Sequence, residues 1–191
     1  MDFVIHINPE EFDLIQACIN DERWAHKKLY EDHYSQMMAI SLRYAGNNDD
    51  ALDILHEGFI KVFKNLHKYQ PGTSVVAWIR KIIVNTAIDF YRKDIRRKSD
   101  ELDTAKHVCT TIPDAISKMT SEEILLALQL LPHSYRSVFN LFVIEGYSHK
   151  EISMLLGINE STCRSNLVKA RTKLKEILIV ADSDLNDRKK I

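Results

Sequence analysis

Apolar residues recur at spacings of three and four along most of the chain, and charged residues fill the positions between them. Side chains at this spacing share one face of an α-helix, so the pattern predicts amphipathic helices. Only five glycines and four prolines interrupt it, and the alternation typical of strands is nearly absent. We therefore expect an all-α fold. Its helices are predicted at about 11–19, 21–45, 48–67, 75–97, 120–131, 133–145, 148–156 and 159–179.

The segment 145–174 has the pattern of two short helices that meet at a glycine turn. Ser148 is placed to cap the first helix, and Glu151 three residues later completes a capping box. Gly157 can adopt the positive φ that ends such a helix, and Asn159 can cap the second. The apolar positions of the second helix are Cys163, Leu167, Ala170 and Leu174. This arrangement predicts a helix-turn-helix, a motif that enters the major groove of double-stranded DNA.

The opposite face of the second helix is suited to contact bases and phosphates. It carries short hydroxyls, one apolar tip and two cations, namely Ser161, Arg164, Ser165, Val168 and Lys169. An ordinary solvated face is the alternative, but such faces usually alternate acids with bases. After Glu160 the next acidic residue is Glu176. The pattern therefore favours DNA reading.

The stretch 99–119 interrupts the helical rhythm. It is rich in Ser, Thr and Asp, contains Pro113, and carries four acidic residues against two lysines. Such a composition buries little apolar surface and predicts a flexible linker. Thr120 and Glu123 form a capping box that restarts helix beyond it. We expect two small helical domains, at 1–98 and 120–180, joined by this linker and followed by a polar tail at 181–191.

A basic helix precedes the linker. Residues 75–98 contain seven basic and two acidic residues. One face of this helix is predicted to carry Trp78, Lys81, Asn85, Asp89, Arg92 and Arg96. The loop before it, 68–74, begins with Lys68 and Tyr69 and adds hydrogen-bonding polar residues. An aromatic ring, polar groups and cations suit unstacked bases, so we expect single-stranded nucleic acid here. The alternative is a charged helix end that only keeps the domain soluble.

The helix predicted at 48–67 has an acidic outer stripe. It comprises Asp49, Asp50, Asp53, His56, Glu57, Ile60 and Lys64. Acids around an exposed isoleucine indicate contact with a basic, partly apolar protein, although solvated stripes are common. Gly58 within this helix costs about 1 kcal/mol relative to alanine. Close packing of a neighbouring helix would explain it.

Composition narrows the possible functions. The formal net charge is −1, so nucleic-acid binding must come from local patches. Three scattered cysteines without CxxC spacing indicate neither a disulfide framework nor a metal site. His56 and Glu57 begin a zincin-like pair, but Ile60 replaces its second histidine, and no phosphate loop or nucleophile motif is present. We expect no enzyme, no cofactor and no small-molecule substrate. Without a signal segment or a membrane-spanning run, a cytoplasmic protein is expected.

These features occur together, in this order, in one family. The chain resembles the extracytoplasmic-function (ECF) class of bacterial sigma factors, compact two-domain members of the sigma-70 superfamily. The resemblance covers about residues 10–180. In the first domain it rests on Leu29-Tyr30, on 50–59 (ALDILHEGF preceded by Asp) and on 77–89 (AWIRKIIVNTAID). In the second it rests on Leu131-Pro132, 135–139 (YRSVF) and 145–171.

The resemblance implies a role for each patch. Asp50, Asp53 and Glu57, with His56 and Ile60 beside them, are similar to the surface that docks on the largest subunit of core RNA polymerase. Tyr69 and Asn85 stand where the family captures a base flipped from the minus-ten promoter element. Residues 160–171, which include Arg171, resemble the reader of the minus-thirty-five element. Family members are commonly held by an anti-sigma factor, so we expect three partners: core polymerase, promoter DNA and such an inhibitor.

Some positions depart from the family pattern. Val75-Val76 begins the basic helix where relatives often have an aromatic or acidic residue, and His56 replaces a common glutamine. Asn166 stands where many relatives carry a cation, so we expect either a weaker phosphate contact or a changed site preference. Two rival functions stay open at this point. One is a regulator that binds DNA through the helix-turn-helix without polymerase, and the other is a degenerate family member that acts as a decoy of polymerase.

Overall fold

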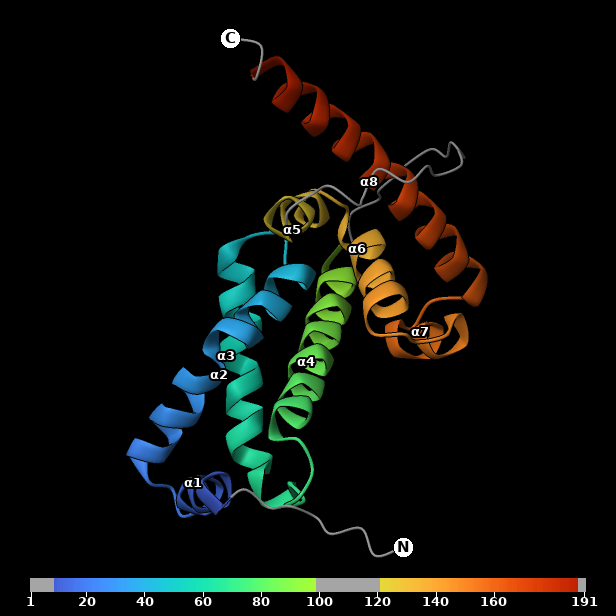
Figure 1. The fold of residues 1–191 in the computed structure, drawn as a ribbon. Coiled ribbons are helices and arrows are strands. Elements are labelled where there is room, and N and C mark those ends of the chain that lie inside the picture. Colours follow the sequence, from blue (N-terminus) through green and yellow to red (C-terminus); the bar gives the residue numbers. More distant parts are fainter. Residues whose placement is uncertain (1–8, 99–120, 189–191) are drawn as a thin grey trace, which may run out of the picture. The chain divides into compact units, whose positions relative to one another are not determined.

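The computed structural model describes residues 9–98 and 121–188, and every regular element within them is a helix. The helices are α1 Pro9–Ile19, α2 Arg23–Tyr44, α3 Asn48–Asn65, the 3-10 helix η1 Leu66–Lys68, α4 Val75–Lys98, α5 Ser121–Gln129, α6 His133–Phe139, the π-helical η3 Asn140–Ile144, α7 His149–Leu156 and α8 Glu160–Arg188 (Figure 1). The predicted all-α fold is confirmed. The predicted linker at 99–119 and the Thr120 cap lie outside the described residues.

Two helices differ from their predicted form. The helix expected at 133–145 changes to π-helical hydrogen bonding at Asn140, where the amide of Glu145 donates to the Asn140 carbonyl at 3.0 Å. The helix expected to end at 179 continues to Arg188. Its apolar period fades after Leu178, but no glycine or proline follows to stop it. Part of the predicted polar tail is therefore helical.

Contacts divide the chain into two compact units. The N-terminal unit comprises residues up to Ser41 and Asn48–Ala87, and the C-terminal unit comprises Leu42–Asn47 and the chain from Ile88 onward. Helices α2 and α4 therefore each contribute to both units.

The N-terminal unit buries the apolar faces of its helices around Phe59. This ring is 2% exposed, and the edge-on ring of Tyr30 lies 4.7 Å away. Further side chains exposed by 3% or less complete the core: Ile15, Leu29, Met37, Ile40, Ile54, Leu55, Val62, Leu66, Ile79 and Ile83. They recur at helical spacing, so the predicted apolar stripes form this core.

Helices α3 and α4 pack closely at Gly58. A Cβ added to Gly58 would overlap the Cδ1 of Ile83, which is itself fully buried. The close packing expected from the sequence is confirmed, and it explains a residue that is unfavourable within a helix.

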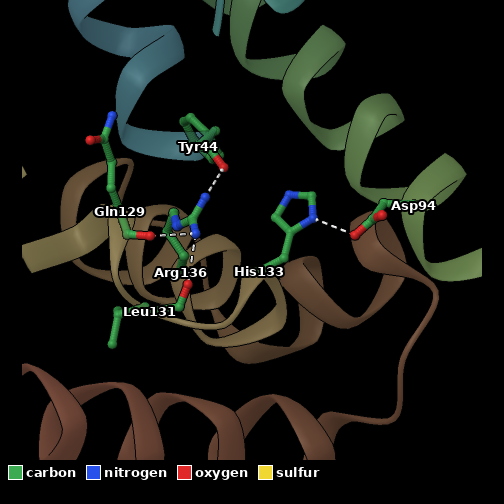
Figure 2. A network of polar contacts seen from close by, with 6 residues as sticks. All are labelled: Tyr44, Asp94, Gln129, Leu131, His133 and Arg136. Carbon is green, nitrogen blue, oxygen red and sulfur yellow. Dashed lines mark hydrogen bonds and ion pairs between the residues drawn. The ribbon is translucent and has the colours of Figure 1, made fainter. Parts of the chain in front are cut away.

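The C-terminal unit is organised around the guanidinium of Arg136, which is 5% exposed. Its Nε donates to the Leu128 carbonyl at 2.9 Å, and Nη1 donates to the Tyr44 carbonyl at 3.0 Å. Nη2 donates to the carbonyls of Gln129 at 2.9 Å and Leu131 at 2.7 Å. Figure 2 shows the side chain of Arg136 pointing toward the carbonyls of Tyr44, Gln129 and Leu131. One side chain thus serves carbonyls at the ends of α2 and α5 and in the turn beyond α5, where helical partners run out. The Leu128 carbonyl also accepts from the Leu131 amide at 3.1 Å.

Two further polar contacts flank Arg136. Asp94 and the Nδ1 of His133 lie 2.9 Å apart (Figure 2). The His133 ring meets Tyr91 edge-on at 5.1 Å. The side-chain amide of Asn140 donates to the Arg43 carbonyl at 2.6 Å. These contacts fix α6 and the π-helical turn that leads toward α7.

An apolar cluster attaches α8 to α5 in the same unit. Its buried members are Ala127, Leu128, Leu131, Ala170, Leu174 and Leu178, and Tyr135 and Phe139 of α6 pack against it. The second helix of the helix-turn-helix is therefore packed against α5 and α6.

Replacement of Gly58 by alanine tests the close packing of α3 and α4. Overpacking a core costs about 1–3 kcal/mol, whereas the better helix propensity of alanine returns up to about 1 kcal/mol. We expect Gly58→Ala to lower the free energy of unfolding measured by denaturant titration. Ile83→Val removes Cδ1 and costs about 0.5–1.5 kcal/mol alone. The loss of stability in the double variant should be smaller than the sum of the losses in the two single variants.

Gly46→Ala is the matched control, because a Cβ there would meet Arg136 at an ordinary contact distance of 3.5 Å. Unchanged stability of Gly58→Ala would contradict the packing explanation.

Candidate nucleic-acid interface and docking surface

The first helix of the helix-turn-helix, α7, forms with its predicted caps. The amide of Glu151 donates to the Ser148 Oγ at 3.3 Å, and the amide of Ser148 donates to Glu151 Oε2 at 2.8 Å. Hydrogen bonds from the Ser148 hydroxyl and amide lower the pKa of the Glu151 carboxyl. Gly157 ends α7 with a φ of 69°. The capping box and the left-handed glycine are confirmed.

Helix α8 presents the predicted outer face. Cys163, Leu167, Ala170 and Leu174 are buried at 7% exposure or less. Ser161, Arg164, Val168 and Arg171 are exposed, and Ser165 and Lys169 are partly exposed. Asn166 is only 8% exposed. This position faces inward, so the expected weakening of a phosphate contact there is not supported by its location.

Neighbouring side chains hold the three cations of this face. The guanidinium of Arg164 lies 2.5 Å from Glu160 Oε1. The Nζ of Lys169 lies 5.6 Å from the Tyr135 ring centroid, and the Arg171 guanidinium lies 6.0 Å from that of Phe142. Cations over aromatic faces are attracted by the ring quadrupole. Their conformations are therefore partly ordered before any ligand binds, which lowers the entropy cost of binding.

Phe142 also joins the two helices of the motif. The ring of His149, at the start of α7, stacks on it with centroids 4.4 Å apart and an interplanar angle of 20°. The Nδ1 of His149 lies 3.3 Å from the Cys163 Sγ of α8. Sequence reasoning did not identify Phe142 or Tyr135 as support for cations. The sequence shows that both residues are aromatic. Which ring faces α8 depends on tertiary packing.

In the loop before α4, Tyr69 does not form the open stacking surface that the sequence suggested. Tyr69 is only 8% exposed, and its hydroxyl contacts both Glu11 Oε1, at 3.0 Å, and the Thr73 carbonyl. Its ring meets Trp78 edge-on, with centroids 5.7 Å apart. In this conformation Tyr69 supports the loop and Trp78 and does not expose its own ring.

Helix α4 carries the remaining candidates for minus-ten contacts. Lys81 and Asn85 are exposed one turn apart, and Trp78, partly exposed, lies on the same face. Lys68, the last residue of η1, is exposed, and its Nζ donates to Asn65 Oδ1 at 2.8 Å.

The last two candidates on α4 belong to the C-terminal unit. The Nη2 of Arg92 donates to the Met154 carbonyl at 3.3 Å. The side chain of Arg96 lies outside the part of the chain that the structure describes in detail.

The outer stripe of α3 is exposed as the sequence pattern predicts. Asp53, His56 and Ile60 are exposed, with Ile60 at 52%, while Asp50 and Glu57 are partly exposed. Glu57 Oε1 lies 3.4 Å from the Nζ of Lys61, and the His56 ring stacks near Tyr30 at 6.3 Å. An exposed isoleucine beside carboxylates offers both apolar contact and charge complementarity to a basic protein.

Across residues 9–98 and 121–188, no group of three or more His, Cys, Asp or Glu side chains is arranged to hold a metal ion. In the same residues, none of the helices combines the length and hydropathy needed to cross a bilayer.

Two known protein families match the chain, one over each part that carries a candidate surface. Sigma-70 region 2 matches residues 29–97, and sigma-70 region 4 matches residues 121–174. Together they cover well over half of the chain. The first includes α3 and α4, and the second includes the helix-turn-helix.

The curated relatives include two sigma factors of the ECF class. The ECF RNA polymerase sigma factor SigE of Mycolicibacterium smegmatis is 30% identical over 82% of this chain, and the match spans 63% of the length of SigE. The ECF RNA polymerase sigma factor EcfG of Rhodopseudomonas palustris is 28% identical over 75% of this chain and 80% of its own length.

A solved structure, the sigma factor RpoE of Bartonella quintana in complex with the anti-sigma factor NepR, is 21% identical. That match covers 81% of this chain and 96% of the other, with a TM-score of 0.47. The matches to regions 2 and 4, in this order, and the similarity to ECF sigma factors agree on one family. The chain belongs to the sigma-70 family, in its extracytoplasmic-function class of sigma factors.

Proposed function

We propose that this sigma factor binds core RNA polymerase through α3 and directs it to promoters that it reads at two elements. The helix-turn-helix would read the minus-thirty-five element as duplex. The loop 68–74 and the exposed face of α4 would stabilise the opened minus-ten element. The function is binding without catalysis, and it would take place in the cytoplasm, where the polymerase and the chromosome are.

The outer face of α8 is the observation that carries this proposal. Three cations, Arg164, Lys169 and Arg171, lie on or beside one face and are held by neighbouring groups. Two hydroxyls and the exposed Val168 lie among them. Side chains of this kind can neutralise phosphates and contact base edges in the major groove.

The exposed stripe of α3 supports polymerase as the second partner. A regulator that binds DNA alone would have no use for Asp53, Glu57 and the exposed Ile60 on one face. A sigma factor needs such a surface, because polymerase holds both DNA-binding regions at once. Linked sites gain avidity that neither small patch has alone. By family resemblance, we include an anti-sigma factor as a third partner.

Run-off transcription with purified core polymerase tests the function directly. We expect the chain to start discrete transcripts from promoters to which core enzyme alone gives none. Pull-down of core polymerase should also succeed. Polymerase binding without promoter-specific transcripts would instead support a decoy, and DNA binding without polymerase binding would support an independent regulator.

Charge reversal on α3 tests the docking surface. Asp53→Lys with Glu57→Lys replaces attraction to a basic partner with repulsion, and the helix keeps good helix formers at both positions. We expect core polymerase binding to fall by at least about 100-fold in a pull-down titration. Circular dichroism should remain unchanged.

Asp13→Lys is the control, because this exposed carboxylate lies on α1 and outside the acidic stripe of α3. Equal losses for the control and the double variant would remove this stripe as the docking surface.

Arg164→Ala tests the reading of duplex DNA. A base contact of arginine is worth about 1–3 kcal/mol of discrimination, so binding to a minus-thirty-five duplex should weaken by about 5- to 150-fold. The preference for one base at the contacted position should also relax. Competition binding with four single-base duplexes measures both effects.

Lys173→Ala is the control variant, because Lys173 is exposed further along α8 and pairs with Glu176 at 3.1 Å. It should leave base preference unchanged. If Arg164→Ala also leaves base preference unchanged, Arg164 contacts phosphate and does not read a base.

A further inference from the structure

Tyr69 connects two segments that are far apart in the sequence. Its ring is 8% exposed, and its hydroxyl lies between the Glu11 carboxylate of α1, at 3.0 Å, and the Thr73 carbonyl of its own loop. The Glu11 contact spans 58 residues of sequence. None of the sequence motifs includes Glu11.

The loop beyond Tyr69 forms a β-turn that a backbone hydrogen bond closes. The amide of Thr73 donates to the Gln70 carbonyl at 3.3 Å, and the Thr73 hydroxyl donates to the same oxygen at 2.8 Å. Gly72 has a φ of 89°, and Pro71 precedes it. Proline followed by a residue of positive φ is the signature of a type II turn. Tyr69 fixes where this turn lies, because its hydroxyl contacts the Thr73 carbonyl.

The Tyr69 hydroxyl has one proton and two acceptors. Burial raises the pKa of Tyr69, and its hydrogen bond with Glu11 raises it further, so the hydroxyl keeps its proton at neutral pH. A charged acceptor forms the stronger hydrogen bond. Glu11 therefore contributes strongly to the position of the Tyr69 hydroxyl. The Thr73 carbonyl in turn contacts that hydroxyl.

The same ring also supports a candidate DNA-binding residue. Tyr69 meets Trp78 edge-on, and Trp78 lies one turn before Lys81 on the outer face of α4. A shift of the Tyr69 ring would therefore move both the turn 70–73 and the support of Trp78.

Apolar contacts hold α1 in place independently of Glu11. Ile15, Ala17 and Cys18 are 2%, 7% and 4% exposed, whereas Glu11 is only partly buried. Loss of the carboxylate should thus leave α1 docked and change chiefly the position of Tyr69.

We propose that Glu11 of α1 is a positioning residue for promoter opening: through the Tyr69 hydroxyl it holds the turn 70–73 and Trp78 in the geometry that receives an unpaired base. This inference rests on the proposed minus-ten function of the loop and α4. Helix α1 thereby becomes part of the DNA-opening element, and base preference at the minus-ten element depends on it.

The test compares open-complex formation by holoenzymes assembled from full-length variants. Permanganate reactivity of unpaired thymines measures the fraction of open promoter. Glu11→Ala and Tyr69→Phe should each lower the open fraction at limiting holoenzyme by about ten-fold, since each removes a hydrogen bond to a charged group. The double variant should be no worse than Tyr69→Phe alone, because that change already removes the Glu11 contact together with the Thr73 contact.

Two further variants separate positioning from general damage. Glu11→Gln keeps an acceptor oxygen and should recover most of the opening. Asp13→Ala removes an exposed carboxylate from the same helix and should match the parent protein. Promoters with each of the four bases in the minus-ten element should show altered base preference for Glu11→Ala. Duplex binding at the minus-thirty-five element and the melting temperature should not change.

Different outcomes address the two proposals separately. If Asn85→Ala and Trp78→Ala impair opening while Glu11→Ala behaves like Asp13→Ala, the role of Glu11 is overturned and the proposed function stands. The role of Glu11 is also overturned if Glu11→Ala lowers the melting temperature and duplex binding together with opening. If Asn85→Ala and Trp78→Ala leave opening intact, the proposed minus-ten function fails, and the inference fails with it.

Discussion

Backbone carbonyls at the ends of helices are the constraint on which the C-terminal unit depends. The last carbonyls of a helix have no partner within it, and burial of one such group without a hydrogen bond costs about 1–3 kcal/mol. Arg136 serves four carbonyls from the ends of α2 and α5 and the turn beyond α5. A guanidinium can do this because its donors point in several fixed directions. Lysine would place one ammonium group in the same space and leave some of these oxygens unsatisfied.

Side chains also satisfy backbone carbonyls in the segments that lead to the proposed binding sites. The Tyr69 hydroxyl lies against the Thr73 carbonyl in the loop before α4, and the amide of Asn140 donates to the Arg43 carbonyl beside the π-helical turn. Each of these side chains secures an irregular backbone segment that precedes a proposed DNA-binding helix. Sites held in this way keep their geometry without a ligand, which lowers the cost of binding.

Local organisation of charge replaces a high overall charge in this protein. The formal net charge is −1, yet Arg164, Lys169 and Arg171 lie on or beside one face of α8, each against an acid or an aromatic ring. A small ordered patch gives modest affinity alone, because phosphate neutralisation grows with the number of contacts. Polymerase would supply the rest by holding both DNA-binding regions on one promoter. Weak binding by the free protein is then an advantage, since it limits competition from nonspecific DNA.

Features that depend on near neighbours followed from the sequence alone. The α-helical pattern, the capping box of Ser148 and Glu151, the left-handed Gly157 and the buried face of α8 all arise from contacts within a few residues. The family followed as well, because its motifs are runs of adjacent residues. Periodicity was less informative about where α8 ends, since its polar last turns retain helix-compatible residues without an apolar stripe.

Tertiary structure decided which faces meet and what each polar side chain contacts. Tyr69 was expected to offer its ring to a base, but it is buried against Glu11, 58 residues away. Arg136 reaches Tyr44 across 92 residues, and Asn166 turns inward although its neighbours Arg164 and Ser165 do not. The amino-acid sequence determined the helices, their apolar faces and the order of the motifs, because hydrogen bonding and side-chain spacing within a helix are local. Only the folded chain decided the partners of its polar groups, because those partners come from distant segments that packing brings together.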